Sequence, residues 1–525
     1  MRATIYLFRA EARSFDDLLR DFPAGTRTPE RRELNGDINI EGEVWVMPQE
    51  PKQPLWLKHV LPLTDISHLR NSTSSVAVLL KASNRFFAVC FGYAQSMLNH
   101  ELLEPEFGLR VTANMADPEK IAAMQVRTLS ENSRQQRSQT ANKSRVADFD
   151  LEVEREWLRY LKADVTTDVD WASGVGGSQS LSISTDRKIV EFPNLLSSLL
   201  REFESESYKN KFPYIDNFTP IAKGDPILDK LWEALIEGVC EPNGKRIGVA
   251  SPDDLLGADV AYWKISGDRK RRGRIEELDF PSIVEQIDPT KLATNRDQLK
   301  IVPINTSDEA IRTKRKLTDY FVFEFESEGE TYALCLGQWF RISPDYVKEI
   351  NDKVAQLDDI TSSLNLPPWT SGKEGDYNKQ VCEDLGFIHL DAQNFAIGGP
   401  HQKVEICDFL TPNFDFVCVK KMEDSATMSH LFSQAAVSAD LYFRNTVGQG
   451  KNSVGYADHI KSLYEQHWGG VTNIEKNRRM VLAVATDKPG PLANSLFFFS
   501  KVNLVQRVED LRKSRFTVAI AKIDR

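Results

Sequence analysis

Segments in which apolar and polar residues alternate predict β-strands along the first part of the chain. Four segments share this pattern: ATIYLFRA (3–10), GEVWVMP (42–48), SSVAVLLKA (74–82) and NRFFAVCFGYA (84–94). The last two meet at a polar turn, Ser83 and Asn84, which predicts a β-hairpin. We expect a helix over 94–104 and a further strand over 107–115. Residues 1–126 therefore predict an N-terminal mixed α/β domain with a mostly antiparallel sheet.

Residues 127–146 break this pattern, because they are rich in Ser, Gln and Arg and nearly free of aliphatic side chains. Such a composition predicts a polar, basic linker or loop. The segment carries five basic residues, Arg127, Arg134, Arg137, Lys143 and Arg145. We favour a solvated connection, and the alternative is a flexible arm that binds the backbone of a nucleic acid.

Residues 147–366 mix both kinds of pattern and predict a helical and β middle region. Helical spacing of apolar residues marks four segments: 149–161, 195–209, 225–239 and 345–357. Strand patterns mark three more: 246–254, 260–266 and a long hairpin over 318–343. We expect this hairpin to turn near Glu328 and Gly329, and Pro367 with Pro368 to mark the end of the region.

Residues 367–525 predict a C-terminal α/β domain, in which helix, strand, strand, strand and helix follow in order. The five segments are GKEGDYNKQVCEDL (372–385), GFIHLDAQNFAIGG (386–399), KVEICDFL (403–410), FDFVCVKKM (414–422) and SATMSHLFSQAAVSADLYF (425–443). Residues 478–523 then predict a strand, a helix and a strand that extend the sheet by parallel pairing. The whole chain is therefore expected to be an α+β protein.

The composition is that of a folded protein, with 41% hydrophobic and 27% charged residues among 525. A formal net charge of -10 argues against a protein that coats DNA generally, although a local basic patch can still bind phosphate. No segment approaches the roughly 20 apolar residues of a membrane span, and the N-terminus lacks a signal-peptide pattern. We therefore expect a cytoplasmic protein that does not associate with a membrane.

Six cysteines are scattered through the chain, and no pair has C-x-x-C spacing: Cys90, Cys240, Cys335, Cys382, Cys407 and Cys418. Most of them lie in apolar segments, which predicts buried thiols in a reducing compartment. Zinc ligation and a disulfide framework are correspondingly disfavoured.

The densest basic run follows Tyr262 and Trp263 and comprises Arg269, Lys270, Arg271, Arg272 and Arg274. A run of this kind is usually a solvated turn, and we favour that interpretation. The alternative is that the run binds the backbone of DNA or RNA. Arg478, Arg479 and Lys501 would add positive charge near a substrate phosphate if they point towards it.

The residues best placed for chemistry lie in the C-terminal domain. Cys418 and Lys420 share one face of the third predicted strand, because side chains alternate along a strand. Asp408 lies late in the preceding strand, and the short connection 411–415 predicts antiparallel neighbours, so that Asp408 and Lys420 can approach each other. Glu374, on the preceding helix, can reach the same end. Carboxylates bind Mg²⁺ or Mn²⁺, and a lysine offsets the charge that develops on a phosphate during hydrolysis.

This order resembles the PD-(D/E)xK nuclease fold, in which one acid comes from the first helix, an Asp from the second strand and a (D/E)-x-K from the third. By position, the resemblance makes Glu374 the acid of the helix, Asp408 the metal-binding Asp and Lys420 the lysine. Gln434 and His430, on the following helix, would be accessory catalytic groups. The resemblance implies a restriction-endonuclease-like α/β domain and a Mg²⁺ or Mn²⁺ cofactor.

One position departs from that pattern, because Cys418 occupies the place of the first acid of (D/E)-x-K. The metal would then lack one carboxylate. Glu405 is the candidate replacement, as a metal ligand beside Asp408 and Glu374. A regular strand turns Glu405 to the other face unless a bulge intervenes. The site is therefore expected to be either rearranged or inactive.

Other interpretations of these residues stay open. Asp408 can cap or pair locally. Cys418 with His430 can form a nucleophile pair, although no third, orienting group is evident. His389 and Asp391 share a strand face, but two groups do not make a metal site.

Over almost its whole length the chain also resembles a sporadically distributed bacterial family of unknown function. Five segments carry this resemblance: FAVCFGYAQSML (87–98), EPEFGLRV (104–111), EGDYN (374–378), VEICDFL (404–410) and KKMEDSATMSHLFSQAAVSADL (420–441). Patchy distribution often accompanies genes of phage defence or mobile elements. We expect a metal-dependent nuclease that hydrolyses phosphodiester bonds in DNA or RNA, in defence against such elements. The alternative is a non-catalytic scaffold or sensor that binds nucleic acid or protein through a degenerate nuclease fold.

Overall fold

The computed structural model describes residues 1–22, 25, 27–34, 40–47, 51, 53, 57, 65, 67–70, 74–128, 135–149, 156–166, 171–241, 247–251, 260–267, 273–305, 310, 315–390, 394–396, 403–422, 425–448, 454–470 and 475–525. The chain divides into two compact units. The first contains Met1–Thr128 and Arg134–Asn217, and the second contains Phe218–Arg525. This division, near residue 217, differs from the domain boundaries expected at residues 126, 146 and 366.

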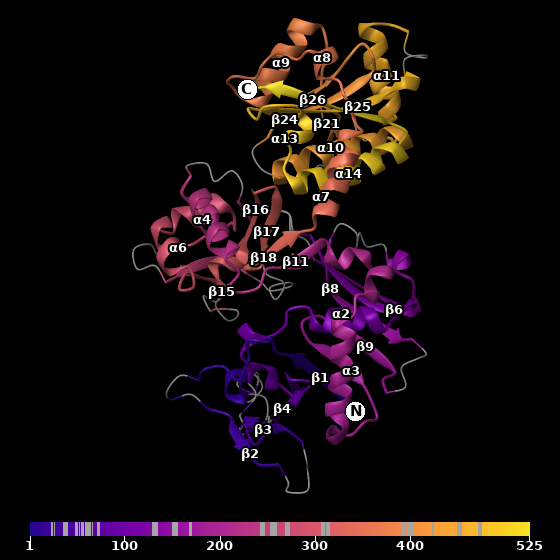
Figure 1. The fold of residues 1–525 in the computed structure, drawn as a ribbon. Helices are drawn as coiled ribbons and strands as arrows, with labels where there is room; N and C mark the ends of the chain where they lie inside the picture. The colour runs from indigo at the N-terminus through magenta and orange to yellow at the C-terminus, as the bar shows by residue number, and fades with distance from the viewer. Residues whose placement is uncertain are drawn as a thin grey trace. The chain divides into compact units, whose positions relative to one another are not determined.

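The first unit is built on one sheet of ten strands in the order β2-β3-β4-β5-β1-β10-β9-β8-β6-β7, in which all neighbours are antiparallel. The strands are β1 (Arg2–Leu7), β2 (Glu30–Arg32), β3 (Gly42–Met47), β4 (Ser75–Ala82), β5 (Arg85–Phe91), β6 (Ala116–Arg127), β7 (Gln135–Ser144), β8 (Trp157–Val165), β9 (Gly174–Gly177) and β10 (Leu181–Ser184). Figure 1 labels β1 to β4, β6, β8 and β9. The antiparallel sheet expected for the N-terminal region is therefore present, and it extends far beyond residue 126.

A tight turn joins β4 to β5 at Ser83 and Asn84, whose φ angles are 49° and 60°. Two successive positive φ values are typical of a type I′ turn, whose twist matches that of the strands it connects. The predicted hairpin is confirmed. After β5 the chain forms two short 3-10 helices, Ala94–Met97 and His100–Leu102, in place of the single helix expected over 94–104.

Two helices, α2 (Phe107–Met115) and α3 (Phe192–Glu204), share one apolar core with a face of this sheet. The strand predicted over 107–115 is therefore wrong. Every residue of α2 except Arg110 is buried, so the sequence shows no polar face that would reveal a helix. The helical spacing appears only in the residues that α2 contributes to the core, Phe107, Val111 and Met115.

A pair of glycines sets how closely α2 approaches the sheet. A Cβ atom on Gly177 of β9 would lie 1.9 Å from the carbonyl oxygen of Gly108, and one on Gly108 would lie 2.0 Å from that of Ser180. Neither position has room for a side chain. The two glycines therefore allow the backbone of the helix to lie directly on β9 and the turn that follows it.

Residues 157–165 form strand β8, although the spacing of their apolar residues predicts a helix. The pairing of β8 with β6 shifts register between Leu158 and Tyr160, so that one extra residue bulges out of the strand. Buried Leu158 and Leu161 are consequently three positions apart, as they would be on a helix. The sequence does not reveal this bulge. It gives the apolar residues of β8 the spacing of a helix, which is why a helix is predicted.

Residues 135–144 form strand β7 at the edge of the sheet, where the composition of 127–146 predicts a linker or loop. An edge strand takes its backbone hydrogen bonds from one neighbour, here β6, and does not need apolar side chains on both faces. Arg137 and Lys143 therefore lie on a strand rather than a flexible arm. Arg134 lies outside the described residues.

The second unit begins with a five-stranded sheet in the order β11-β18-β17-β16-β12 and a three-stranded sheet in the order β13-β14-β15. Their strands are β11 (Phe218–Pro220), β12 (Ile247–Val249), β13 (Tyr262–Ser266), β14 (Lys300–Ile304), β15 (Arg315–Lys316), β16 (Phe321–Ser327), β17 (Glu330–Cys335) and β18 (Gln338–Ile342). The helices are α4 (Ile227–Cys240), α5 (Phe280–Glu285), α6 (Pro289–Asn295) and α7 (Pro344–Ala355). The hairpin of β16 and β17 turns at Glu328 and Gly329, as predicted, with φ angles of 56° and 80°.

The C-terminal part contains a six-stranded sheet in the order β19-β26-β25-β24-β23-β20. Its strands are β19 (Asp358–Asp359), β20 (Ile388–His389), β23 (Phe409–Leu410), β24 (Asp415–Lys421), β25 (Arg479–Thr486) and β26 (Thr517–Asp524). β20, β23 and β24 pair antiparallel, whereas β24, β25, β26 and β19 pair parallel. The parallel extension expected for the last two strands is confirmed.

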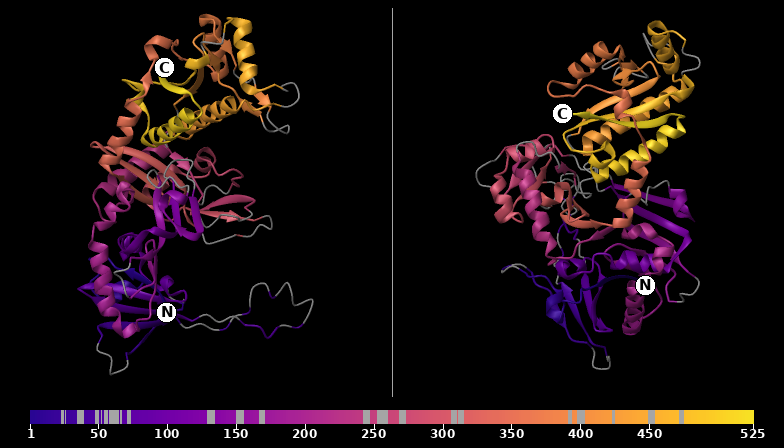
Figure 2. Two further views of the ribbon diagram at one scale, coloured as in Figure 1. Left: turned by 90° about the vertical axis from the view of Figure 1, so that its right-hand side faces the viewer. Right: turned by 45° about the horizontal axis from the view of Figure 1, so that its top comes forward.

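Helices cover both faces of this sheet (Figure 1 and Figure 2). On one face, Val417 and Val419 of β24 share a core with Tyr377 and Val381 of α9 (Glu374–Leu385). On the other face, Phe416 contacts Tyr442 of α10 at a ring-centroid distance of 5.5 Å. The helices of this part are α8 (Thr361–Leu364), α9, α10 (Ser425–Arg444), α11 (Tyr456–His467), α13 (Leu492–Ser495) and α14 (Phe498–Lys513).

The second strand predicted for this domain, residues 403–410, is split in two. β22 (Lys403–Glu405) pairs with β21 (Asn394–Ala396) in a separate two-stranded sheet, whereas β23 joins the main sheet. Glu405 and Asp408 are thus carried by different sheets, which the sequence pattern does not indicate.

Helices and strands are mixed in both units, so the chain is an α+β protein, as expected. Across the ranges that the structure describes, no helix combines the length and apolar character needed to cross a bilayer.

Candidate functional site

Helix α9 begins with two acids, Glu374 and Asp376, which is favourable because the positive end of the helix dipole lies there. Its buried residues include Asn378, which is four positions after Glu374 and therefore on the same side of the helix. The helix lies over β24, so this side turns towards the end of that strand. Glu374 and Asn378 together form the edge of the candidate site.

Asp408 precedes β23 and is fixed through both its backbone and its side chain. Its N–H donates to the carbonyl oxygen of Val417, and its own carbonyl oxygen accepts from the N–H of Leu390, each at 2.9 Å. One carboxylate oxygen accepts from the side-chain amide of Asn378 at 2.8 Å, and the other accepts from the N–H of Val419 at 2.6 Å. The carboxylate therefore lies against β24, beside the backbone that carries Lys420.

Lys420 points to the same helix. Its Nζ lies 2.9 Å from Oε1 of Glu374, and the two side chains are 26% and 35% exposed. A pair this open to solvent contributes little to stability, but it holds the ammonium group at the N-terminal end of α9. Helix α9 thus contacts Lys420 through Glu374 and Asp408 through Asn378, and all four residues form one cluster.

Lys421 anchors the segment that leads into α9. Its Nζ donates to the carbonyl oxygen of Gly372 at 3.0 Å and lies 4.2 Å from the ring centroid of Trp369. Trp369 stacks on Tyr377 at 4.7 Å, and the Tyr377 hydroxyl donates to the carbonyl oxygen of Pro367. These contacts fix the start of the helix and therefore the position of Glu374.

Cys418 lies on the opposite face of β24 from Val417 and Val419, with Sγ 3.9 Å from Sδ of Met480. Burial raises the pKa of the Cys418 thiol well above its ordinary value, and the nearby charges of Asp408 and Glu405 raise it further. A reactive cysteine needs a lowered pKa, so this thiol stays protonated. The nucleophile pair considered for Cys418 and His430 is therefore disfavoured.

Glu405 and Gln434 form a second polar contact. The Gln434 side-chain amide, on α10, donates to Oε2 of Glu405 at 2.6 Å. The charges of both Glu405 and Asp408 raise the pKa of Cys418, so both carboxylates lie near that thiol. His430 is exposed on α10, one turn before Gln434. Gln434 therefore bonds to Glu405 of the two-stranded sheet.

The three carboxylates expected to bind a divalent cation have separate partners: Asp408 bonds to Asn378, Glu405 to Gln434 and Glu374 to Lys420. Among the described residues, no group of three or more His, Cys, Asp and Glu side chains is arranged to hold a metal ion. Mg²⁺ nevertheless often binds through only one or two carboxylates and takes its other ligands from water and substrate phosphate. Asp408 is a hard oxygen donor of this kind, whereas Glu405 lies in the other sheet and bonds to Gln434. Glu374, expected as a further ligand, contacts Lys420 instead.

The basic run after Trp263, for which nucleic-acid binding is the alternative interpretation, lies largely outside the described residues. The described residues leave out Arg269, Lys270, Arg271 and Arg272. The guanidinium of Arg274 lies 4.4 Å from the ring centroid of Tyr262.

The pair of His389 and Asp391 is described only in part. His389 lies on β20, whereas Asp391 lies outside the described residues.

Arg479 and Lys501 do not border the cluster. Arg479 pairs with Asp415 at 2.9 Å, and both residues begin their parallel strands. Lys420 lies five residues further along β24, roughly 16 Å away at the rise of a strand. Lys501 is 8% exposed and donates to Asn351 at 2.8 Å. Neither residue therefore adds charge at the carboxyl end of β24, contrary to the expectation.

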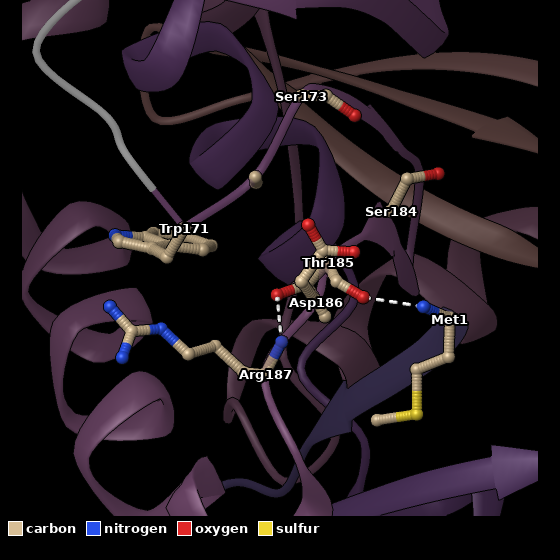
Figure 3. Close-up of a pocket in the computed structure, with 8 residues that line it drawn as sticks. Met1, Trp171, Ser173, Ser184, Thr185, Asp186 and Arg187 are labelled. Atoms are coloured by element: carbon tan, nitrogen blue, oxygen red, sulfur yellow. Dashed lines mark hydrogen bonds between the residues drawn. The ribbon is translucent and has the colours of Figure 1, made fainter.

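The first unit contains a cavity of about 420 Å³ (Figure 3). The N-terminal ammonium of Met1 donates to the carbonyl oxygen of Thr185, and the N–H of Arg187 donates to the Thr185 hydroxyl at 3.1 Å. Trp171 and Asp186 complete the charged and aromatic lining. The lining has a single carboxylate and no His or Cys, so the better candidate for chemistry is the cluster around Asp408 and Lys420.

Reasoning from sequence missed Asn378 and Lys421. Asn378 follows Glu374 by four residues within EGDYN (374–378), so helical spacing already places the two side by side. Lys421 follows the lysine of the motif, and its position on the α9 face of β24 follows from strand alternation. Its contact with Trp369 depends on the path of residues 367–373, which no local pattern indicates.

Comparison with known proteins places the whole chain in one group. No curated protein and no solved structure matches it. A model of a family of unknown function, DUF6119, matches residues 3–524, and the chain therefore belongs to that family.

Proposed function

We propose that the second unit is a metal-dependent nuclease that hydrolyses phosphodiester bonds in DNA or RNA. The observation that carries this proposal is the cluster at the start of α9, where Glu374 holds Lys420 at 2.9 Å and Asn378 holds Asp408 at 2.8 Å. A carboxylate and an ammonium group at the end of one strand are the groups that phosphodiester hydrolysis requires.

The connection of the elements supports the same proposal. Helix α9, strands β20, β23 and β24, helix α10 and strand β25 occur in this order in the chain, with β21 and β22 inserted before β23 and α11 before β25. The strands lie in the sheet order β20-β23-β24-β25. An acid from the first helix, an Asp from the second strand and a Lys from the third is the order that a PD-(D/E)xK nuclease domain has. Cys418 is the one departure from that motif.

Each residue of the cluster has a distinct task in the proposed reaction. Asp408 would hold a divalent cation, which would supply positive charge against the phosphoryl oxygens. Glu405 lies in the other sheet, where it bonds to Gln434. Lys420 offsets the negative charge that grows on the phosphate as the bond breaks. Glu374 holds the ammonium group in place, and Asn378 fixes the orientation of the Asp408 carboxylate.

The biological setting that we propose is defence against phage or mobile elements. Its basis is the resemblance to a patchily distributed bacterial family, which is an argument by analogy rather than from the site.

A second candidate function is a scaffold or sensor that binds nucleic acid or protein without catalysis. Two observations favour it. Cys418, in the place of an acid, is buried and protonated. The described residues also offer no group of three metal ligands. This candidate predicts binding without divalent-ion uptake and without cleavage.

A cleavage assay tests the first candidate. Plasmid DNA, linear DNA and RNA are incubated with Mg²⁺ or Mn²⁺ and with the wild type, Asp408→Asn or Lys420→Met, which preserve side-chain size. We expect cleavage by the wild type and a loss of about a hundredfold or more in each variant, because each removes a charge from the reaction.

Asp376→Asn and Lys379→Ala are the matched controls, since both residues are exposed on α9 outside the cluster. They are expected to cleave as the wild type does. Equal activity in all five proteins would show that cleavage arises elsewhere, and an inactive wild type would favour the scaffold.

A further inference from the structure

Strands β8 and β6 of the first unit have one face in an apolar core and an opposite, outer face, and β9 and β7 flank them in the sheet. Met124 of β6 and Leu161 of β8 pair across the two strands and belong to the core. Because side chains alternate, the adjacent residues point to the outer face. Two cross-strand rows lie there, Gln139 with Ala123 and Lys162, and Arg137 with Gln125 and Tyr160. We call these six residues the outer row pair.

Arg137 and Lys162 carry positive charge on this face, where Asp164, two positions after Lys162 on β8, pairs with Lys143 of β7. Arg137 and Lys162 are exposed, and neither forms an ion pair with any residue that the structure describes. The three paired segments 123–127, 135–139 and 157–162 are all described and contain no Asp or Glu. The face is therefore locally basic in a chain whose net charge is -10.

An aromatic ring lies beside these cations. The guanidinium of Arg137 is 5.9 Å from the ring centroid of Tyr160. A Cβ atom on Gly176 of β9 would lie 2.7 Å from the Tyr160 hydroxyl, so the phenol extends over this glycine, in space that any side chain would fill. The ring thus lies along the sheet, and Tyr160 remains only half-buried.

A second aromatic–cation pair lies on the same strand. The guanidinium of Arg159, in the bulge of β8, is 5.1 Å from the ring of Trp157. Two rings with two guanidinium groups and a lysine therefore occupy β8 and the edge strand β7.

We propose that the outer row pair binds single-stranded nucleic acid. Arg137 and Lys162 contact phosphates, and Tyr160 stacks on a base, which is the combination that single-strand binding surfaces use. Four strands span about 14 Å, and a four-stranded sheet with exposed aromatic side chains can stack two or three bases. Duplexes bind less well, because their bases are already stacked on one another and cannot reach a ring that lies on a sheet.

This inference concerns the first unit and needs no cleavage. It is therefore independent of the nuclease proposed for the second unit. Binding is measured in EDTA, so that metal-dependent chemistry does not enter. A chain that binds through this face but cuts nothing would contradict the proposed function and leave this inference intact.

The first test uses charge. Full-length protein is titrated into fluorescent 12-nucleotide single strands of DNA and of RNA, and into the duplex of the same DNA sequence, with anisotropy as the readout. The double variant Arg137→Glu/Lys162→Glu is expected to bind single strands at least about tenfold more weakly and to lower the slope of log Kd against log salt by about 2.

The matched control is Lys188→Glu/Arg201→Glu, which changes the net charge equally. Both residues are exposed in the first unit, and Arg201 lies on α3, which packs on the other face of the sheet. The control is expected to bind within about twofold of the wild type. The inference is overturned if both double variants weaken equally, if the wild type prefers the duplex, or if it binds neither single strand.

The second test uses the ring. Tyr160→Phe keeps the aromatic face and is expected to bind as the wild type does, whereas Tyr160→Leu keeps apolar bulk and is expected to lose about tenfold. Thermal melting of both variants checks the fold. A Leu variant that melts and binds like the wild type would contradict stacking at Tyr160.

Discussion

Asp408 accepts hydrogen bonds at both carboxylate oxygens from donors that belong to two elements, the side chain of Asn378 and the backbone of Val419. This arrangement fixes the orientation of the carboxylate before any ligand arrives. A site organised in this way loses little conformational freedom on binding, which favours chemistry that depends on exact placement. Lys420 is held less tightly, by one partly exposed ion pair with Glu374.

Cysteine reactivity provides a prediction at the scale of single residues. Iodoacetamide at pH 8 is expected to modify native Cys240, which is exposed, and to spare Cys407 and Cys418. Burial raises the pKa of both these thiols well above its usual value, and the thiolate is the species that reacts. Mass spectrometry of the alkylated peptides provides the measurement.

The control is the same reaction in guanidinium chloride, where all six cysteines should be modified. Modification of native Cys418 as fast as Cys240 would mean that its thiol is accessible and ionised. The pair of Cys418 with His430 would then become the stronger candidate for chemistry.

Part of the candidate cluster could be predicted from single residues and part could not. The short connection predicts that β23 and β24 are antiparallel neighbours, and they are. Asp408 contacts Asn378 and Lys420 contacts Glu374, both on α9. The separation of Glu405 into another sheet could not be predicted, because the break between β22 and β23 has no Gly or Pro to mark it. The contacts of Cys418 with Met480 depend on the parallel partner strand, which is some sixty residues away in sequence.

At the scale of elements, Glu324 joins the five-stranded sheet to helix α14. Its carboxylate accepts from the N–H groups of Phe498 and Phe499, the latter at 3.0 Å, at the N-terminus of the helix. These N–H groups have no partner within the helix, so an acceptor from β16 satisfies them. The contact connects two sheets of the second unit through one side chain.

Glu324 provides a prediction on pH. Burial raises its pKa from 4.5 to about 7, against the opposing effect of the two N–H donors. A folded-state pKa above the unfolded one means that the folded state binds the proton more tightly, so this contribution to stability is full below about 4.5 and is lost as pH rises through about 7.

Glu324→Gln stays neutral and removes this dependence. Relative to that variant, the wild type is expected to lose roughly 1–3 kcal/mol of stability between pH 5 and pH 8. Denaturant midpoints measured across this range provide the test. Parallel pH profiles for the two proteins would show that the carboxyl does not titrate in this window.

Elements were predictable where one period held along the whole segment. The helix α9, the strand β24 and the hairpin at Glu328 and Gly329 all satisfy this condition. Prediction failed at 107–115, where burial on all sides hides the helical face of α2. It also failed at 157–165, where the bulge in β8 changes the period.

At the scale of the whole molecule, the ten-stranded sheet explains why the expected boundary near residue 126 does not exist. Strands β6 and β7, on either side of that residue, pair with each other, and β10 returns to pair with β1. The first and last strands, β1 and β10, are neighbours in the middle of the sheet and join its two halves, so the residues between them belong to one unit. The composition of residues 127–146 does not show which strand the segment pairs with. The segment therefore resembles a linker in sequence.

The two proposals assign separate tasks to the two units. The first unit presents a basic and aromatic sheet face for a single strand, and the second presents an acid and an ammonium group at the start of α9. One family model matches residues 3–524, so both units belong to the same family of proteins. Binding and cleavage can therefore be tested separately in one protein.

The most direct test of the central claim is calorimetric titration with Mn²⁺. The claim is that Asp408 binds a divalent ion beside Lys420. We expect saturable heat for the wild type and for Asp376→Asn, whose acid lies on the same helix outside the cluster, and no heat for Asp408→Asn. Absence of heat in the wild type, or equal heat in Asp408→Asn, would contradict the account.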